Sequence, residues 1–395
     1  MDRLWEMIAE RVLQRIDFSK EPEEETLKEV IAKEIACCNQ KRDLTIAQRI
    51  ELEQRVYNAL KKMDILQELL DDPEVTEILV NGPSHIFYEK HGRMQEYEYH
   101  FSSEERLQGV IQQMVGRHNR VVNFASPIVD TRLEDGSRVN VVLSPVSIDG
   151  SAVSIRKFST ESMDMEFLIQ QESITREAAD FLRILVENRY NLFISGGTSS
   201  GKTTFLNALS AYIPPYERVI TIEDSAELKL QGIRNAVRLE TRTANMEGIQ
   251  PITARELIHT ALRMRPDRII VGECRGAEAL DMLQAMNTGH DGSVSTGHAN
   301  STRDMLHRLE TMVLMACDLP LLAVRQQIAA GIDVMVHLER DSCGARRVVE
   351  IAEVVAVEGQ EIITQVLFAR EGALEKKGSL IRRSKLKNAA VSDVI

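Results

Sequence analysis

Hydrophobic residues in the first 70 positions are spaced as on the buried face of a helix. In the second half of this stretch they recur at intervals of three and four residues, at Leu52, Val56, Ala59, Leu60, Met63 and Leu66. This is the period of an amphipathic helix. An acidic run over 21–25 separates two such stretches, and we expect it to be an exposed connection. The pattern predicts a helical N-terminal segment over 1–70.

Residues 71–160 have a mixed pattern. Two expected strands, 76–80 and 85–89, flank Asn81-Gly82-Pro83, whose dipeptides are strong turn formers. Asp135-Gly136 joins two short alternating runs, which predicts a hairpin. We therefore predict a small α+β domain over 71–160.

Capping boxes mark two expected helix starts. Ser102 with Glu105, and Thr253 with Glu256, have the required spacing of three residues. In this motif the two side chains bond reciprocally to free backbone N–H groups of the first turn. One helix is therefore expected in each half of the chain at these positions.

Strand and helix patterns alternate in the second half of the chain. Apolar runs typical of strands lie at 191–194, 219–222, 268–271, 348–357 and 362–368, and helical stretches separate the first three. Such alternation predicts a parallel, doubly wound sheet. We expect this α/β domain over 176–395, after a linker over 161–175.

Composition narrows the class of protein. With 395 residues, 43% hydrophobic and 27% charged, the chain has the make-up of a globular protein of two or three domains. The richest apolar stretch, 312–324, contains Asp318 and Pro320 and falls short of the ~18 residues of a membrane span. The five cysteines form no CxxC pair, so neither a zinc knuckle nor a disulfide framework is indicated. We find no secretory signal and expect a cytoplasmic protein.

The net charge of −12 argues against general attraction to nucleic acid, which depends on Lys and Arg. A basic tail carries Arg382, Arg383, Lys385 and Lys387. A local basic patch is one interpretation of this tail. We favour a solvated terminal charge run.

The strongest motif lies between a predicted strand and a predicted helix. Its residues are Gly196, Gly197, Thr198, Ser199, Ser200, Gly201, Lys202, Thr203 and Thr204, which fit the phosphate-binding pattern G-x-x-x-x-G-K-[ST]. Backbone N–H groups of such a loop surround a β-phosphate, and the helix N-terminus adds partial positive charge. We expect Lys202 to reach the β- and γ-phosphates and Thr203 to bind Mg²⁺. The motif therefore predicts a phosphate-binding loop.

Two acidic residues follow predicted strands. Glu223 ends the run over 219–222, and Glu273 follows the run over 268–271. Ligands of open α/β sheets bind beyond the carboxyl ends of the strands. One carboxylate could orient the attacking water and the other could hold Mg²⁺ through water. Either could instead be a solvated carboxylate at a strand end.

His290 and His298 have no zinc-site spacing. A sensor of the γ-phosphate and an ordinary hydrogen-bonding residue both remain open for His298. Arginines on the predicted hairpin and the next strand, and others after the first acid, could supply a charge to the transition state or be ordinary surface residues. They are Arg132, Arg138, Arg156, Arg238 and Arg242.

Together these segments resemble the type II/type IV secretion and pilus-assembly ATPase family, most closely its CpaF-type branch, the motor of tight-adherence (Flp) pili. The resemblance rests on DDPEVTEILVNGPSHIFYEKHGRM (71–94), SPIVDTRLEDGSRVNVVLSP (126–145), SIRKF (154–158), FISGGTSSGKTT (193–204), TIEDSAEL (221–228), VRLETR (237–242), ALRMRPDRIIVGECRGAEALDMLQAMNTGHDGS (261–293) and STGHANS (295–301). These cover most of 71–340.

The resemblance implies a RecA-like P-loop domain, preceded by a smaller PAS-like α+β domain, and a hexameric ring. It makes the loop at 196–204 the Walker A motif, Glu223 the catalytic glutamate, Glu273 the end of an atypical Walker B strand and His298 part of the His box. Arg138 and Arg156 would reach the phosphates from the N-terminal side, with Arg132 less certain. Gly272 stands where many P-loop enzymes have a Mg²⁺-binding Asp, and Cys274 where many relatives have Val. The four-cysteine insertion of the general-secretion branch is absent.

The expected function is a cytoplasmic hexameric ATPase, peripheral at the inner face of the membrane. It would use ATP and Mg²⁺ to drive pilus assembly or secretion through an inner-membrane platform protein. The alternative is a traffic ATPase of a type IV secretion system that exports protein or DNA. A RecA-like nucleic-acid motor fits less well, because the chain lacks a basic stripe with interleaved aromatic residues.

Overall fold

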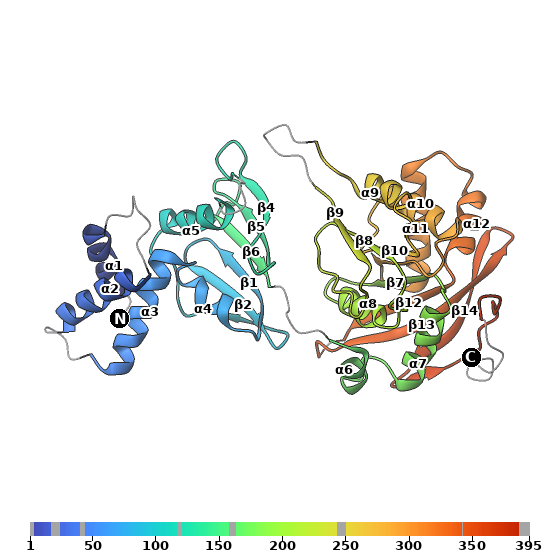
Figure 1. Ribbon diagram of the computed structural model, residues 1–395, viewed down its shortest axis with the longest axis horizontal. Coiled ribbons are helices and arrows are strands. Elements are labelled where there is room, and N and C mark those ends of the chain that lie inside the picture. Colours follow the sequence, from blue (N-terminus) through green and yellow to red (C-terminus); the bar gives the residue numbers. More distant parts are fainter. Residues whose placement is uncertain are drawn as a thin grey trace. The chain divides into compact units, whose positions relative to one another are not determined.

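The computed structural model describes residues 4–16, 24–39, 44–116, 121–157, 163–242, 250–341 and 343–386 (Figure 1). Outside these ranges fall most of the acidic run over 21–25, the end of the segment 154–158, the start of the linker predicted over 161–175, and Lys387. The chain divides into two compact units, Met1–Thr160 and Glu161–Ile395.

Three helices begin the first unit: α1 (Leu4–Arg15), α2 (Glu24–Asn39) and α3 (Ile46–Lys61). Their apolar faces share one cluster of buried residues, which includes Ile8, Leu27, Ile31 and Val56. A capping box of Thr45 and Gln48 starts α3. The helical pattern predicted for this region is therefore present, with the helices packed against one another.

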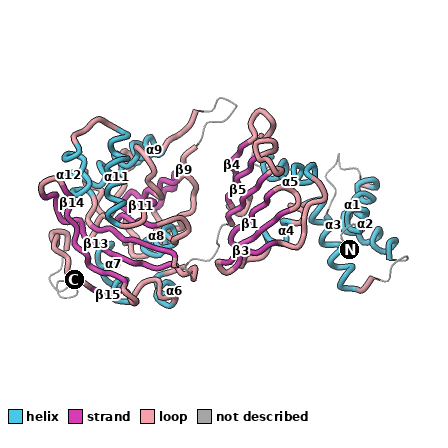
Figure 2. Tube along the Cα trace, turned by 180° about the vertical axis from the view of Figure 1, so that it is seen from behind, coloured by secondary structure: helices cyan, strands magenta, loops and turns pink. Residues whose placement is uncertain are grey.

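The rest of the first unit is built on an antiparallel sheet (Figure 2). Its strand order is β3-β2-β1-β6-β5-β4. The strands are β1 (Val75–Asn81), β2 (His85–Lys90), β3 (Arg93–Glu96), β4 (Ile128–Arg132), β5 (Arg138–Val142) and β6 (Ala152–Arg156). Helices α4 (Leu66–Asp71) and α5 (Glu104–Gly116) share its apolar core, where Ile78, Val139 and Ile155 pack with Leu66 and Leu107. The hairpin predicted at Asp135-Gly136 joins β4 to β5.

The expected capping box at Ser102 is wrong by one residue. Helix α5 begins at Glu104, and the Ser103 hydroxyl accepts the backbone N–H of Arg106 at 3.3 Å. Two serines stand together before this helix, so the pattern alone matches the first of them. The box at Thr253 and Glu256 is confirmed.

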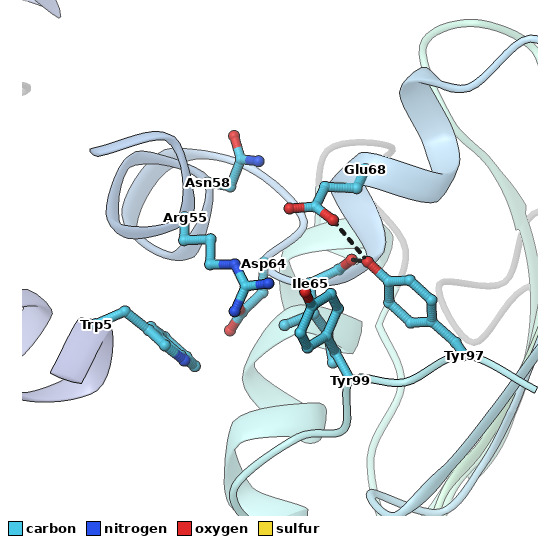
Figure 3. A pocket seen from close by; sticks show the side chains of 8 residues that line it. All are labelled: Trp5, Arg55, Asn58, Asp64, Ile65, Glu68, Tyr97 and Tyr99. Carbon is cyan, nitrogen blue, oxygen red and sulfur yellow. Dashed lines mark hydrogen bonds between the residues drawn. The ribbon is translucent and has the colours of Figure 1, made fainter. Parts of the chain in front are cut away.

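A small polar pocket lies where the N-terminal helices meet the sheet domain of the first unit (Figure 3). The Arg55 guanidinium lies 3.9 Å from the centre of the Tyr99 ring, and the Tyr97 hydroxyl donates to Glu68 at 2.9 Å. Asp64, which is 3% exposed, accepts from Arg106 at 2.5 Å. Burial raises the pKa of Asp64 above its ordinary value, and the Arg106 charge opposes that shift. Paired charges and a cation–π contact thus fix this junction.

The second unit contains a nine-stranded sheet with the order β15-β14-β13-β12-β7-β11-β10-β8-β9. Its strands are β7 (Leu192–Gly196), β8 (Val219–Glu223), β9 (Ala236–Glu240), β10 (Arg268–Val271), β11 (Val294–His298), β12 (Val334–Arg340), β13 (Arg346–Glu358), β14 (Glu361–Arg370) and β15 (Leu374–Lys376). Strands from β12 to β9 pair in parallel, as predicted, whereas β13, β14 and β15 add an antiparallel edge.

Helices cover both faces of this sheet (Figure 1). They are α6 (Met165–Gln170), α7 (Arg176–Glu187), α8 (Lys202–Ser210), α9 (Ala254–Ala261), α10 (Glu278–Asn287), α11 (Thr302–Ala316) and α12 (Leu321–Gly331). Successive side chains of a strand point to opposite faces. Leu192 and Ile194 of β7 accordingly join the cluster of α6, α7 and α8, while Phe193 joins that of α9 to α12. The predicted α/β, RecA-like class of fold is confirmed.

In the described part of the chain no single helix has the length and apolar composition to cross a membrane. Helices α11 and α12 reach the required length and apolar composition only when taken together, and they are bent by 119° from one another.

The expectation of a solvated charge run at the basic tail is wrong for Arg382 and Lys385, whereas Arg383 is exposed as expected. Lys385 Nζ lies 2.7 Å from Asp333 Oδ2 and 2.6 Å from Asp291 Oδ1. The backbone N–H of Arg382 donates to the buried carboxylate of Glu353 at 2.6 Å. Because Asp333 is 3% exposed, it needs such a partner. Arg382 and Lys385 therefore neutralise a buried acid of the second unit, Asp333.

A buried ion pair stands at the start of β10. Arg268 is fully buried, and its Nε lies 2.5 Å from Glu217 Oε2. Arg189 donates to the other oxygen of Glu217 at 3.0 Å. Replacing one partner of a buried pair leaves an uncompensated charge in the core.

Glu217→Ala should lower the free energy of unfolding by about 3–5 kcal/mol, because Arg268 would remain buried without its carboxylate. Urea denaturation followed by circular dichroism measures this loss. Glu371→Ala is the control, since that glutamate is 77% exposed and lies 3.6 Å from Lys377. Equal denaturation midpoints for the two variants would contradict the importance of the buried pair.

Candidate nucleotide-binding site

The predicted phosphate-binding loop connects β7 to α8. Gly196 ends the strand, and Lys202, Thr203 and Thr204 form the first turn of the helix. A Cβ atom on Gly196 would lie 2.4 Å from the carbonyl oxygen of Leu338, so the close packing of β12 excludes any side chain there. Gly201 has φ +92°, a conformation that glycine adopts without steric cost. Two glycines of the motif are therefore required by the local backbone.

Lys202 points back into this loop. Its ammonium group donates to the carbonyl oxygens of Gly196 at 3.0 Å and Gly197 at 2.8 Å. The neighbouring Ser200 hydroxyl is buried and has no hydrogen-bond partner in the described part of the chain. Such an unpaired donor usually has a functional or structural reason. A cationic donor and a free hydroxyl thus lie where a phosphate would offer oxygens.

His298 and Glu273 extend this site to the neighbouring strands. His298, at the end of β11, stands opposite Gly196 of β7. Its Nδ1 is 3.3 Å from Lys202 Nζ. His298 Nε2 lies 2.9 Å from Glu273 Oε1. Because the ammonium group is a donor, Nδ1 accepts, and the proton of the neutral ring is on Nε2.

The electrostatic setting of His298 favours this neutral ring. Burial lowers the pKa of His298 below its ordinary value, the Glu273 carboxylate raises it, and the Lys202 charge lowers it further. Of the residues predicted for the site, Lys202, His298 and Glu273 are brought together in this way.

Glu223 lies at the carboxyl end of β8, two strands from β11. Its Oε2 accepts the backbone N–H groups of Glu227 at 2.7 Å and Leu228 at 2.8 Å. Oε1 is buried and has no hydrogen-bond partner in the described part of the chain. Burial raises the pKa of Glu223, and the two backbone bonds oppose that rise. One oxygen is thus held and the other is available to accept a proton.

Gly272 makes room for this glutamate. A Cβ atom on Gly272 would lie 3.0 Å from Glu223 Cγ, closer than most real contacts. Gly272, which follows β10 and stands where many P-loop enzymes have an acidic residue, therefore leaves space for the side chain of Glu223.

The predicted arginines belong to different parts of the chain. Three of them lie on neighbouring strands of the first unit. Arg138 of β5 stands opposite Arg132 of β4 on one side and opposite Arg156 of β6 on the other. In the second unit, Arg238 donates to Ala226 O at 3.4 Å and Arg242 to Gln250 O at 3.1 Å. The three arginines of the first unit therefore form one row across its sheet.

Sequence reasoning missed two polar residues of the site. Arg275 donates to Glu273 at 2.8 Å and lies 3.8 Å from Asp224, so it joins two acids at the ends of β10 and β8. His337, which is 2% exposed, has its Nδ1 2.8 Å from the hydroxyl of Ser195, the residue before the loop. Arg275 lies within the charged turn after Glu273 and was detectable, whereas nothing local links His337 to position 195.

No group of three or more His, Cys, Asp or Glu side chains arranged for a metal ion occurs among the described residues. His290 instead has its Nδ1 3.3 Å from the carbonyl oxygen of Ala285. Cys274 is buried, and burial raises its pKa to about 12, as expected for a cysteine that packs as a small apolar residue.

Solved structures with this fold include an ATPase and a pilus retraction motor. The Legionella pneumophila ATPase DotB is 21% identical, with 74% of this chain and 80% of that chain covered and a TM-score of 0.54. The pilus retraction motor PilT with bound ADP is 18% identical, with 76% and 84% covered and a TM-score of 0.52. At these identities the likeness concerns the fold.

Relatives found by sequence have a higher identity to this chain than these two structures have. A conjugal transfer protein of Mycobacterium tuberculosis, a designation given as provisional, is 34% identical over 80% of this chain and 91% of its own length. PtlH, a type IV secretion system protein of Bordetella pertussis, is 33% identical over 72% and 91%. TrbB, a conjugal transfer protein of Rhizobium radiobacter, is 32% identical over 75% and 88%. A family model described as type II/IV secretion system protein matches residues 59–383. The chain therefore belongs to the family of type II/IV secretion system proteins.

Proposed function

We propose that this protein is an ATPase that converts ATP hydrolysis into mechanical work for a secretion or pilus-assembly machine. The observation that carries the proposal is the position of Lys202, whose ammonium group is held inside the loop by two carbonyl oxygens, next to His298. An ATP phosphate chain could replace these carbonyls as the acceptor. Family membership supports the same activity.

Each residue has a chemical role in this proposal. Lys202 and the loop N–H groups would bind the β- and γ-phosphates. Glu223, with one free oxygen and a raised pKa, would orient the attacking water and accept its proton. Glu273 would fix His298, whose neutral ring would respond to the presence of the γ-phosphate.

The residues present also fit a magnesium ion. Thr203, in the first turn of α8, has a hydroxyl oxygen of the kind that Mg²⁺ prefers. The ion would neutralise charge on the phosphates when bound. Gly272 provides no carboxylate, so any second protein ligand would have to come from another residue.

The finer assignment is a hexamer of the CpaF type that acts at the inner face of the cell membrane on a platform protein and assembles Flp pili. In that ring Arg138 and Arg156 would supply positive charge to the phosphates. The alternative is a traffic ATPase of a type IV secretion system, which the names of PtlH and TrbB favour. We retain the predicted domain limits at residues 70, 160 and 175 as part of this proposal.

Glu223→Gln should bind ATP normally and lose hydrolysis by about 10²–10⁴-fold, because an amide cannot accept the proton of water. The substitution keeps the size of the side chain, and its oxygen can still accept from Glu227 and Leu228. Phosphate release measures turnover, and calorimetric titration with ADP measures binding. Glu240→Gln, in register with Glu223 on β9, is the control. Undiminished hydrolysis in the Glu223→Gln variant would exclude Glu223 as the base.

Arg138→Ala should leave nucleotide binding by isolated subunits nearly unchanged and reduce hydrolysis by the assembled oligomer about 10³-fold or more, as expected for an arginine that stabilises transition-state charge. Hydrolysis per site is compared with that of Arg93→Ala, an exposed arginine at the other edge of the same sheet. Equal rates per site in the Arg138 variant and the parent oligomer would refute the role.

A further inference from the structure

The turn between β12 and β13 lies beside the phosphate-binding loop. Strand β12 pairs in parallel with β7 up to Leu338, which stands opposite Gly196. It then continues by two residues to Arg340, whose partner across the antiparallel ladder is Arg346. The end of this hairpin therefore extends past β7 and runs alongside the loop.

Arg346 contacts the loop at two points. Its Nε donates to the backbone carbonyl oxygen of Ser199 at 3.1 Å. Its Cδ lies 3.2 Å from the position that a Cβ atom on Gly201 would take. The aliphatic part of Arg346 thus packs against Gly201, while the guanidinium group holds the carbonyl of the loop.

The carbonyl of Ser199 belongs to a strained part of the loop. Ser199 has φ +58°, which is uncommon for a residue other than glycine and persists only where the surroundings hold it. In a trans peptide the C=O and the following N–H point in opposite directions. A donor that fixes the Ser199 oxygen on the outside of the loop therefore turns the Ser200 N–H to the inside.

The Ser200 N–H is weakly bound in this arrangement. It points at the carbonyl oxygen of Gly197 at 3.4 Å, beyond the roughly 2.7–3.2 Å that is typical of an N–H···O hydrogen bond. It is therefore an inward-facing donor that a phosphate oxygen would satisfy better.

We propose that Arg346 is a positioning residue of the phosphate-binding loop, which fixes the Ser199–Ser200 peptide so that its N–H faces the nucleotide phosphates. The inference rests on the proposed nucleotide site and adds to it a residue from the antiparallel edge of the sheet. Arg346 acts through the backbone of the loop. Its loss should therefore weaken nucleotide binding without disturbing the fold.

The test is calorimetric titration of the full-length protein with ADP. Arg346→Ala should weaken ADP binding about tenfold, and its unfolding midpoint without nucleotide should equal that of the parent. Arg346→Lys, which keeps a cationic donor on a flexible stem, should recover most of the affinity. Arg340→Ala is the matched control, because it removes the same charge from the partner position of the same hairpin.

Two results would overturn the proposal. One is an Arg346→Ala affinity within twofold of the parent, and the other is an equal loss in Arg340→Ala, which would indicate a general effect of charge. If Arg346→Lys bound ADP as weakly as Arg346→Ala, this would contradict the role of position 346 as a cationic hydrogen-bond donor. Failure of the parent protein itself to bind ADP would instead refute the proposed nucleotide site, so the two failures are distinguishable.

Discussion

Lys202 is only 8% exposed, and the geometry of the site depends on how its ammonium charge is accommodated. A buried charge is costly unless it is paired or hydrogen-bonded. Here the carbonyl oxygens of Gly196 and Gly197 and the ring nitrogen of His298 accept from it. The lysine thereby links the loop after β7 to the end of β11. Through His298 it also approaches Glu273, at the end of β10.

The parallel part of the sheet makes this arrangement possible. Strands β7, β11, β10 and β8 are neighbours in that order, so their carboxyl ends bring Gly196, His298, Glu273 and Glu223 to one edge. Packing is tight enough to fix residue types by volume. Leu338 excludes a side chain at Gly196, and Glu223 leaves little space for one at Gly272. The second of these contacts gives a physical reason for the missing acidic residue.

The sequence was sufficient wherever the signal is local. The loop motif, the strand-end acids, the hairpin at Asp135-Gly136 and the alternation that predicts a parallel sheet can all be identified within short windows. Long-range pairing was not accessible. The contact of His337 with Ser195 and the position of Arg346 beside Ser199 join residues more than 140 positions apart, and their sequence neighbourhoods carry no motif. The basic tail was misjudged for the same reason, since its partner Asp333 is remote in sequence.

The central claim is that the full-length protein hydrolyses ATP as an assembled motor. Light scattering and phosphate release, measured on the same sample with and without ATP and Mg²⁺, test it directly. The account predicts a species of about six times 44.6 kDa that releases phosphate continuously. A monomer that binds no nucleotide, or that binds it without turnover, would contradict the claim.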